Sequence, residues 1–172
     1  MVNLAYVKSQ LDYSYETGKF TWKVDGKGRK RGHEAGCLSN QNGYVLIGLK
    51  GRLYLAHRLA WWHFYGEEPG RYLDHIDRNR SNNSILNLRK VTHKQNMANS
   101  VARSTSGSGI KGVSWCSSTK KWRATITVDG KQRSLGRHKS IEDAAKAYAA
   151  ASIKEYGEYA AAVTFYDLEP HA

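Results

Sequence analysis

Residues 74–89 of this chain read DHIDRNRSNNSILNLR. The stretch combines an Asp-His pair, several asparagines and a short apolar run. An aspartate offers a carboxylate ligand to a metal ion, and a histidine offers an imidazole whose pKa lies near neutrality. A lone Asp-His pair is most often part of a polar loop with a satisfied histidine, so the neighbouring segments must decide between the two interpretations.

The segments around this stretch predict a strand, a turn, a second strand and a helix, in that order. Residues 72–77 and 87–89 favour the two strands, and a helix follows over residues 92–97. A compact hairpin packed on that helix would bring Asp74, His75 and Asn96 to one small cleft. Carboxylate and amide oxygens suit magnesium or manganese, whereas the other nearby histidines do not form a ligand-spaced set for zinc.

The charge of the chain indicates a polyanionic partner. The net charge is +12 and the sequence pI is about 9.7. Residues 104–139 carry eight Lys or Arg against one acidic side chain, whereas residues 140–172 carry two against six. Such a surplus favours nucleic acid over a membrane surface. No apolar run reaches the eighteen residues of a membrane span, and the two cysteines are too far apart in sequence to indicate a disulfide framework.

Asp74-His75, Asn87 and Asn96 resemble the ββα-metal motif of HNH endonucleases, in the variant whose last histidine is replaced by asparagine. Over residues 44–99 the chain is similar to HNH homing enzymes of phages and introns. The resemblance implies that His75 is the general base that activates water. It also implies that Asp74 and Asn96 hold one divalent ion, Mg²⁺ or Mn²⁺, and that Asn87 positions the loop that carries His75.

The segment before the motif has its own local signals. Residues 4–11 favour a short helix and residues 20–24 a strand, while residues 44–55 favour a hairpin around Lys50-Gly51. A helix over residues 56–66 would end at its final glycine. The basic, glycine-punctuated residues 27–32 fit either a solvated loop or a phosphate-binding loop.

The segment after the motif predicts a second module. Residues 102–109 are rich in Ser and Gly and read as a linker. Alternating patterns predict strands over residues 110–115, 121–128 and 131–137, with a tight turn at Asp129-Gly130. A helix then begins after Ser140 and ends at Gly157. We therefore expect a three-stranded antiparallel sheet with one packed helix, whose free face carries basic and hydroxyl side chains.

This second module, over residues 109–165, resembles the AP2/ERF DNA-binding domain. The resemblance rests on Lys111-Gly112-Val113, Lys121-Trp122-Arg123-Ala124, Leu135-Gly136 and Glu142-Asp143-Ala144-Ala145. It implies that the sheet docks in the major groove of double-stranded DNA. The residues that it implies as DNA contacts are Lys111, Trp115, Arg123, Thr125, Thr127, Arg133 and Arg137.

Together these patterns predict an α+β protein. We expect an HNH domain over residues 1–101 with its core motif at 72–99, a linker at 102–109 and an AP2-like domain at 110–166. The expected function is a site-specific, metal-dependent DNA endonuclease that nicks one strand, as in phage homing enzymes. We expect a monomer or weak dimer, with no small-molecule cofactor and no membrane contact, in the cytoplasm of a bacterial host.

Two alternatives remain open at the level of sequence. In the first, the chain is a non-catalytic, sequence-specific DNA-binding protein, in which the AP2-like part works and the Asp-His segment is a structural hairpin. In the second, the chain is a nuclease directed at RNA or at a particular nucleic-acid structure, because basic charge alone does not discriminate between substrates.

Overall fold

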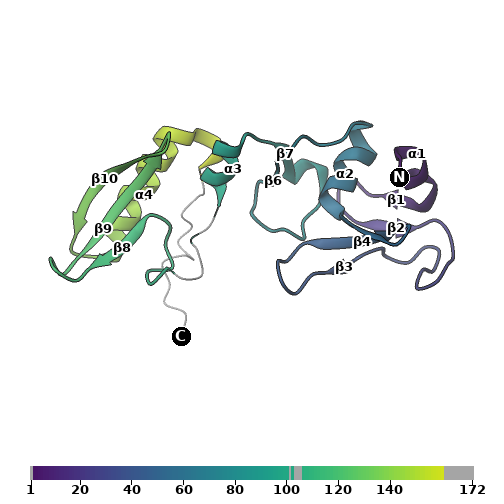
Figure 1. Cartoon of the computed structure of the whole chain (residues 1–172), viewed down its shortest axis with the longest axis horizontal. Helices are drawn as coiled ribbons and strands as arrows, with labels where there is room; N and C mark the ends of the chain where they lie inside the picture. The colour runs from purple at the N-terminus through teal and green to yellow at the C-terminus, as the bar shows by residue number, and fades with distance from the viewer. Residues whose placement is uncertain (1, 101, 103–105, 161–172) are drawn as a thin grey trace. The chain divides into compact units, whose positions relative to one another are not determined.

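The chain forms two compact units, residues 1–92 and 93–172, in a computed structural model that describes residues 2–100, 102 and 106–160. Each unit has its own hydrophobic core and mixes helices with antiparallel strands, as the α+β prediction required (Figure 1). The division falls after Thr92, before the expected linker at 102–109. Part of that linker, and the end of the expected AP2-like domain, lie outside the described residues.

The first unit contains three small antiparallel sheets and two α-helices. Its core is formed by side chains from most of these elements, including Val7, Leu11, Phe20, Ile47 and Leu59. The elements in chain order are α1 (Leu4–Gln10), β1 (Leu11–Tyr13), β2 (Phe20–Trp22), β3 (Cys37–Leu38), β4 (Val45–Leu49), β5 (Arg52–Leu55), α2 (Ala56–Tyr65), β6 (Leu73–His75), a 3₁₀ turn (Ile85–Asn87) and β7 (Leu88–Lys90).

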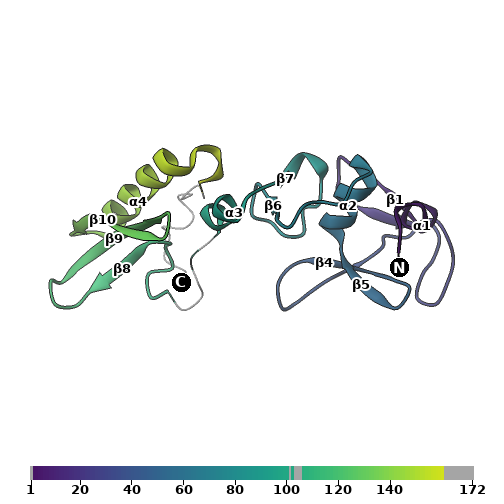
Figure 2. The same ribbon diagram turned by 45° about the horizontal axis from the view of Figure 1, so that its top comes forward.

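The hairpin of β4 and β5 confirms the prediction made from Lys50-Gly51. Both turn residues have positive φ, 46° and 73°, as a type I′ connection requires. Helix α2 follows directly after β5 (Figure 2). It is capped at its C-terminal end by Gly66, whose amide donates to the carbonyl of Trp62. This arrangement places the buried His57 in the first turn of α2.

Strands β6 and β7 confirm the predicted hairpin around residues 74–89. Asp74 pairs with Arg89 and His75 pairs with Leu88 across the two antiparallel strands. The prediction was wrong for Asn87, which lies in a 3₁₀ turn before β7 and not within the strand. The side chain of Asn87 bonds to the loop before it, to the amide of Asp77 and the carbonyl of Asn82.

An N-terminal segment, residues 13–18, packs directly against the loop between β6 and β7. The Tyr13 hydroxyl donates to the carbonyl of Asn83 at 2.8 Å, and the carbonyl of Tyr15 accepts from Ser84 Oγ at 3.0 Å. Gly18 has φ +72°, and a Cβ built on it would lie 2.1 Å from the Ser84 nitrogen. Only a glycine fits this contact, so the segment holds the loop in place.

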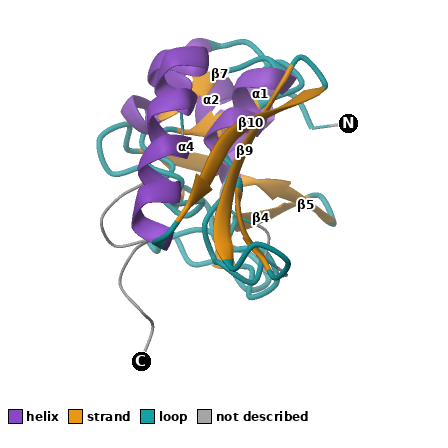
Figure 3. Cartoon of the chain, turned by 90° about the vertical axis from the view of Figure 1, so that its left-hand side faces the viewer, coloured by secondary structure: helices purple, strands orange, loops and turns teal. Residues whose placement is uncertain are grey.

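The second unit confirms the predicted sheet and helix. Its strands lie in the order β10-β9-β8, and helix α4 covers one face of this sheet (Figure 3). Asp129 and Gly130 form the β9–β10 turn with φ of 49° and 76°. The elements are α3 (His93–Asn99), β8 (Val113–Cys116), β9 (Lys121–Val128), β10 (Lys131–His138), α4 (Ile141–Tyr156) and a 3₁₀ turn (Gly157–Tyr159).

Alternation along β9 separates the two faces of the sheet. Ala124, Ile126 and Val128 are buried against α4, and Trp122 packs on the same core. The side chains between them therefore point to the face that α4 leaves uncovered. Among the helices within residues 2–100, 102 and 106–160, none has the length and apolar composition needed to cross a bilayer.

The contact at Gly18 predicts a specific stability defect. Gly18→Ala adds a Cβ that overlaps the Asn83–Ser84 backbone, so we expect the free energy of unfolding in urea to fall by about 3 kcal/mol or more. Gly28 has a similar φ of +70° with nothing within 4 Å of its Cβ position, so Gly28→Ala should lose only about 1 kcal/mol. Equal losses in the two variants would contradict the contact.

Candidate active site and nucleic-acid interface

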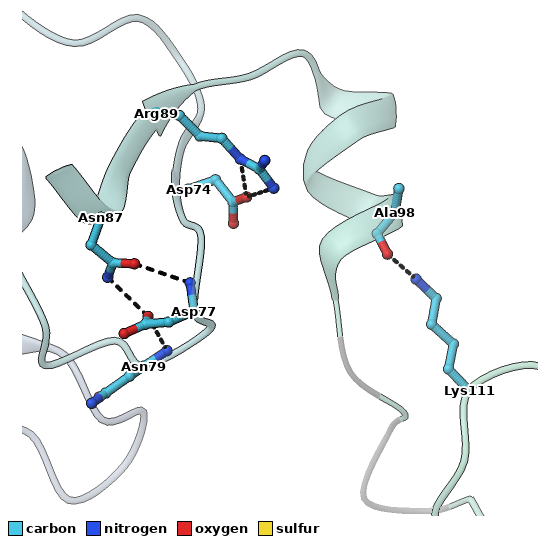
Figure 4. Close-up of polar contacts among 7 residues, drawn as sticks. All are labelled: Asp74, Asp77, Asn79, Asn87, Arg89, Ala98 and Lys111. Carbon is cyan, nitrogen blue, oxygen red and sulfur yellow. Dashed lines mark hydrogen bonds and ion pairs between the residues drawn. The ribbon is translucent and has the colours of Figure 1, made fainter. Parts of the chain in front are cut away.

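The loop between β6 and β7 is closed by the side chain of Asn87. Its Oδ1 accepts from the backbone amide of Asp77 at 3.0 Å, and its Nδ2 donates to Asp77 Oδ1 at 2.9 Å (Figure 4). The same Nδ2 also donates to the carbonyl of Asn82 at 2.9 Å. The carbonyl of Asn87 also accepts from the amide of Ile76. One amide group thereby joins the two ends of the loop that follows His75.

Asp77 is the second organising residue of the loop. Its Oδ1 accepts from the amide of Asn79 at 2.8 Å and its Oδ2 accepts from Asn82 Nδ2 at 2.7 Å. Partial burial opposes ionisation of this carboxyl, but the hydrogen bonds from Asn82, Asn87 and Asn79 outweigh it and lower its pKa. The loop is therefore held by an ionised carboxylate at neutral pH.

Asp74 is buried and forms an ion pair across the hairpin. Arg89 donates from Nε at 3.2 Å and from Nη2 at 3.1 Å to the same oxygen, Asp74 Oδ2 (Figure 4). The two residues are direct partners in the β6–β7 register, so their side chains leave the same face of the hairpin. The arginine fixes the carboxylate in one orientation.

His75 is buried beside Asp74, with 4% of its surface exposed. Its Nε2 lies 3.2 Å from Asn83 Oδ1, within hydrogen-bond distance. Burial lowers the pKa of His75 from its ordinary value, although the bond to Asn83 and the charges of Asp77 and Asp74 act in the opposite direction. A lowered pKa keeps this imidazole neutral, and so able to accept a proton, at physiological pH.

Two aromatic rings form a wall against His75. The rings of His57 and His75 meet edge to face with centroids 4.9 Å apart, and the ring of Tyr44 lies 5.1 Å from His57 and 6.0 Å from His75. His57 Nδ1 is buried and has no hydrogen-bond partner among the described residues. Burial first, and then the neighbouring His75, lowers the pKa of His57 to about 3. His57 is therefore a neutral ring.

The donor set at this hairpin fits a hard divalent cation better than zinc. Within the described part of the chain, no three His, Cys, Asp or Glu side chains gather into a metal-binding group. One carboxylate, from Asp74, is compatible with magnesium, which keeps several waters and takes the rest of its ligands from amides and phosphates. The other predicted ligand, Asn96, lies on α3 in the second unit.

Four of the predicted DNA contacts share the uncovered face of the second sheet. Arg123, Thr125 and Thr127 alternate with the buried side chains of β9. Arg137 on β10 is the direct cross-strand partner of Arg123 and so points to the same face. Two arginines opposite each other repel, and an anion bound between them would relieve this repulsion.

The other three predicted contacts lie elsewhere. Arg133 is the partner of Ile126 on the helix side and donates to Glu155 Oε1 of α4 at 2.9 Å. Trp115 pairs with Trp122, also on the helix side. Lys111 Nζ donates to the carbonyl of Ala98 at 3.0 Å, and burial lowers its pKa to about 8 (Figure 4). The contact of these three residues with DNA stays a prediction.

Sequence reasoning gave no role to several residues that organise the site. The carboxylate of Asp74 is bound by Arg89, and the imidazole of His75 lies against Asn83 and the ring of His57. The ring of Tyr44 packs against His57. The pairing of Arg89 with Asp74 could be predicted only from the strand register, which depends on the length of the turn between β6 and β7. No sequence signal distinguishes Asn83 from the other asparagines in the loop.

Known protein families and relatives match the part of the chain that contains this hairpin. A family profile described as HNH endonuclease matches residues 54–98. Protein 3.8 of Escherichia phage T7 is 37% identical over 93 residues, which are 54% of this chain and 77% of that protein. DNA endonuclease I-HmuI of Bacillus phage SP01 is 44% identical over 70 residues, which are 38% of this chain and 40% of that protein.

A solved structure, described as DNA binding and cleavage by the HNH homing endonuclease I-HmuI, covers 84% of this chain and 80% of its own at 26% identity. Its TM-score is 0.44. Because of the profile match and the identity to the phage T7 protein over most of its length, the chain belongs to the HNH endonuclease family. It is a DNA endonuclease, a hydrolase of phosphodiester bonds, with homing endonucleases among its relatives.

The neutral, buried His57 predicts a loss of stability in acid. The unfolded chain binds a proton at His57 below about pH 6.5, whereas the folded chain does not until about pH 3, so stability falls as the pH falls through this window. His57→Phe should reduce the loss of unfolding free energy between about pH 6.5 and 5 by about 2 kcal/mol.

Urea unfolding at a series of pH values measures this effect. His33→Phe, at an exposed histidine of the same unit, is the control and should keep the acid sensitivity of the natural protein. An unchanged pH dependence in His57→Phe would show that His57 is not held neutral.

Proposed function

We propose that the chain nicks one strand of double-stranded DNA with His75 as general base and one Mg²⁺ or Mn²⁺ ion held by Asp74 and Asn96. The observation that carries the proposal is the environment of His75. A buried imidazole with a lowered pKa lies next to a buried carboxylate that an arginine orients. HNH nucleases generally depend on a divalent metal ion, and this donor set suits a hard cation.

The chemistry assigned to each residue follows from its group. His75 accepts the proton of a water molecule as that water attacks the phosphorus atom in line with the leaving 3′ oxygen. A bound divalent ion stabilises negative charge on the phosphoryl oxygens and on the leaving oxygen. Asn87 keeps the loop closed, and Arg89 keeps the Asp74 carboxylate in place. The proposal requires α3 to bring Asn96 to Asp74.

The second unit, in this proposal, is an AP2-like module that binds DNA through the uncovered face of its sheet. Support comes from Arg123, Arg137, Thr125 and Thr127, which share that face. A β-sheet face of this size fits the major groove. The module raises the effective concentration of the nuclease unit at a preferred site. A monomer with one hydrolytic site cuts one strand, which accounts for a nick. The relatives from phages support a phage-encoded enzyme that acts in a bacterial host.

A plasmid-nicking assay tests the assignment of His75. With Mg²⁺, the natural chain should convert supercoiled plasmid to the open circle, and His75→Ala should be slower by about 10²-fold or more because the general base is lost. DNA affinity should stay the same in the variant. Equal nicking rates would contradict the role of His75, and faster cleavage of a matched RNA would contradict the choice of substrate.

The two faces of the sheet predict different effects of losing the same charge. Arg123→Ala and Arg137→Ala should each weaken DNA binding about tenfold and flatten the dependence of log K on log salt by about 0.9 per lost phosphate contact. Lys154→Ala removes one positive charge from helix α4, on the covered side of the sheet, and should change neither quantity appreciably. Fluorescence anisotropy with a labelled duplex measures both. Equal effects of all three substitutions would contradict binding through the free face.

A further inference from the structure

Asn83 is the one asparagine of the β6–β7 loop whose side chain is shown to meet the imidazole of His75. It is 2% exposed, and its Oδ1 lies 3.2 Å from His75 Nε2. Its Nδ2 donates to the carbonyl of Ser81 at 3.2 Å. We propose that Asn83 is a positioning residue that holds neutral His75 in the tautomer with its proton on Nε2. This inference rests on the proposed role of His75 as general base.

The orientation of the Asn83 amide follows from its two partners. The carbonyl of Ser81 can only accept a hydrogen bond, so the amide must present Nδ2 to it and Oδ1 to His75. An amide oxygen can only accept as well, and the ring nitrogen that faces it must carry a hydrogen. Neutral His75 therefore has its proton on Nε2 and its lone pair on Nδ1. The water that His75 activates is deprotonated by Nδ1.

The N-terminal segment fixes Asn83 in turn. The Tyr13 hydroxyl bonds to the Asn83 carbonyl at 2.8 Å, and the carbonyl of Tyr15 accepts from the amide of Ile85 at 3.1 Å. Gly18 lies so close that a Cβ there would be 2.3 Å from the Asn83 carbonyl carbon. Residues 13–18 lie outside the segment that the family profile matches. Residues 13–18 therefore support the site from outside the profile, because they fix Asn83, which in turn positions His75.

Nuclear magnetic resonance of the full-length chain with ¹⁵N-labelled histidine tests the inference without DNA or metal. At about pH 8, the natural chain should show His75 with its proton on Nε2, hydrogen-bonded and slow to exchange with water. Asn83→Leu keeps the size of the side chain and removes the acceptor, so the protected Nε2 proton should be lost. Asn83→Asp keeps an acceptor oxygen and should keep the proton on Nε2.

Asn79→Leu is the matched control. Asn79 lies in the same loop and its side chain bonds Ser81 and not His75, so the His75 signal should not change. In the nicking assay, Asn83→Leu should lower kcat by about 10- to 100-fold with the duplex affinity unchanged. His75→Ala assigns the resonance.

The outcomes separate the inference from the proposed function. A protected Nε2 proton that persists in Asn83→Leu, in a variant whose other resonances remain those of the folded chain, would overturn the role of Asn83. So would a natural chain with its proton on Nδ1. If instead the tautomer behaves as described but His75→Ala nicks as fast as the natural chain, the proposed function fails and the positioning of His75 stands.

Discussion

The amide of Asn87 is the constraint on which the site depends. It satisfies the backbone amide of Asp77, one oxygen of the Asp77 carboxylate and the carbonyl of Asn82 with a single side chain. A loop between two three-residue strands has too few ladder hydrogen bonds to hold its own shape. The side-chain bonds replace them, because a buried polar group left unpaired costs about 1–3 kcal/mol. These bonds stabilise the loop that follows the Asp-His pair.

Two further sets of contacts fix the residues next to this loop. Towards the hairpin, Arg89 holds the Asp74 carboxylate, and towards the N-terminus, Tyr13 and Gly18 hold Asn83 against His75. The rings of His57 and Tyr44 pack against the imidazole of His75, and burial lowers its pKa. In the proposed function the general base must be uncharged at the pH of the cell, although it lies next to the groups that would bind the cation.

Much of this could be predicted from the sequence, for reasons that are local. Lys50-Gly51 and Asp129-Gly130 determine two hairpins through their backbone preferences, and alternation along residues 121–128 determines which face of the second sheet is buried. The faces of Arg133 and Trp115 could not be predicted, because the cross-strand register that pairs them with Ile126 and Trp122 depends on turn lengths and on irregularities along the strands. The contacts of residues 13–18 with Asn83 and Ser84 could not be predicted, because they join positions about seventy residues apart in sequence.

The proposed function places one divalent ion beside His75, held by the carboxylate of Asp74 and the amide oxygen of Asn96. Anomalous X-ray diffraction from crystals of the chain with Mn²⁺ and a duplex measures this directly. The account predicts a single strong manganese peak about 2.2 Å from an oxygen of each of these two side chains and next to one phosphate of the DNA. A peak that contacts the DNA phosphate without either Asp74 or Asn96, or that is coordinated by His75 itself, would contradict it.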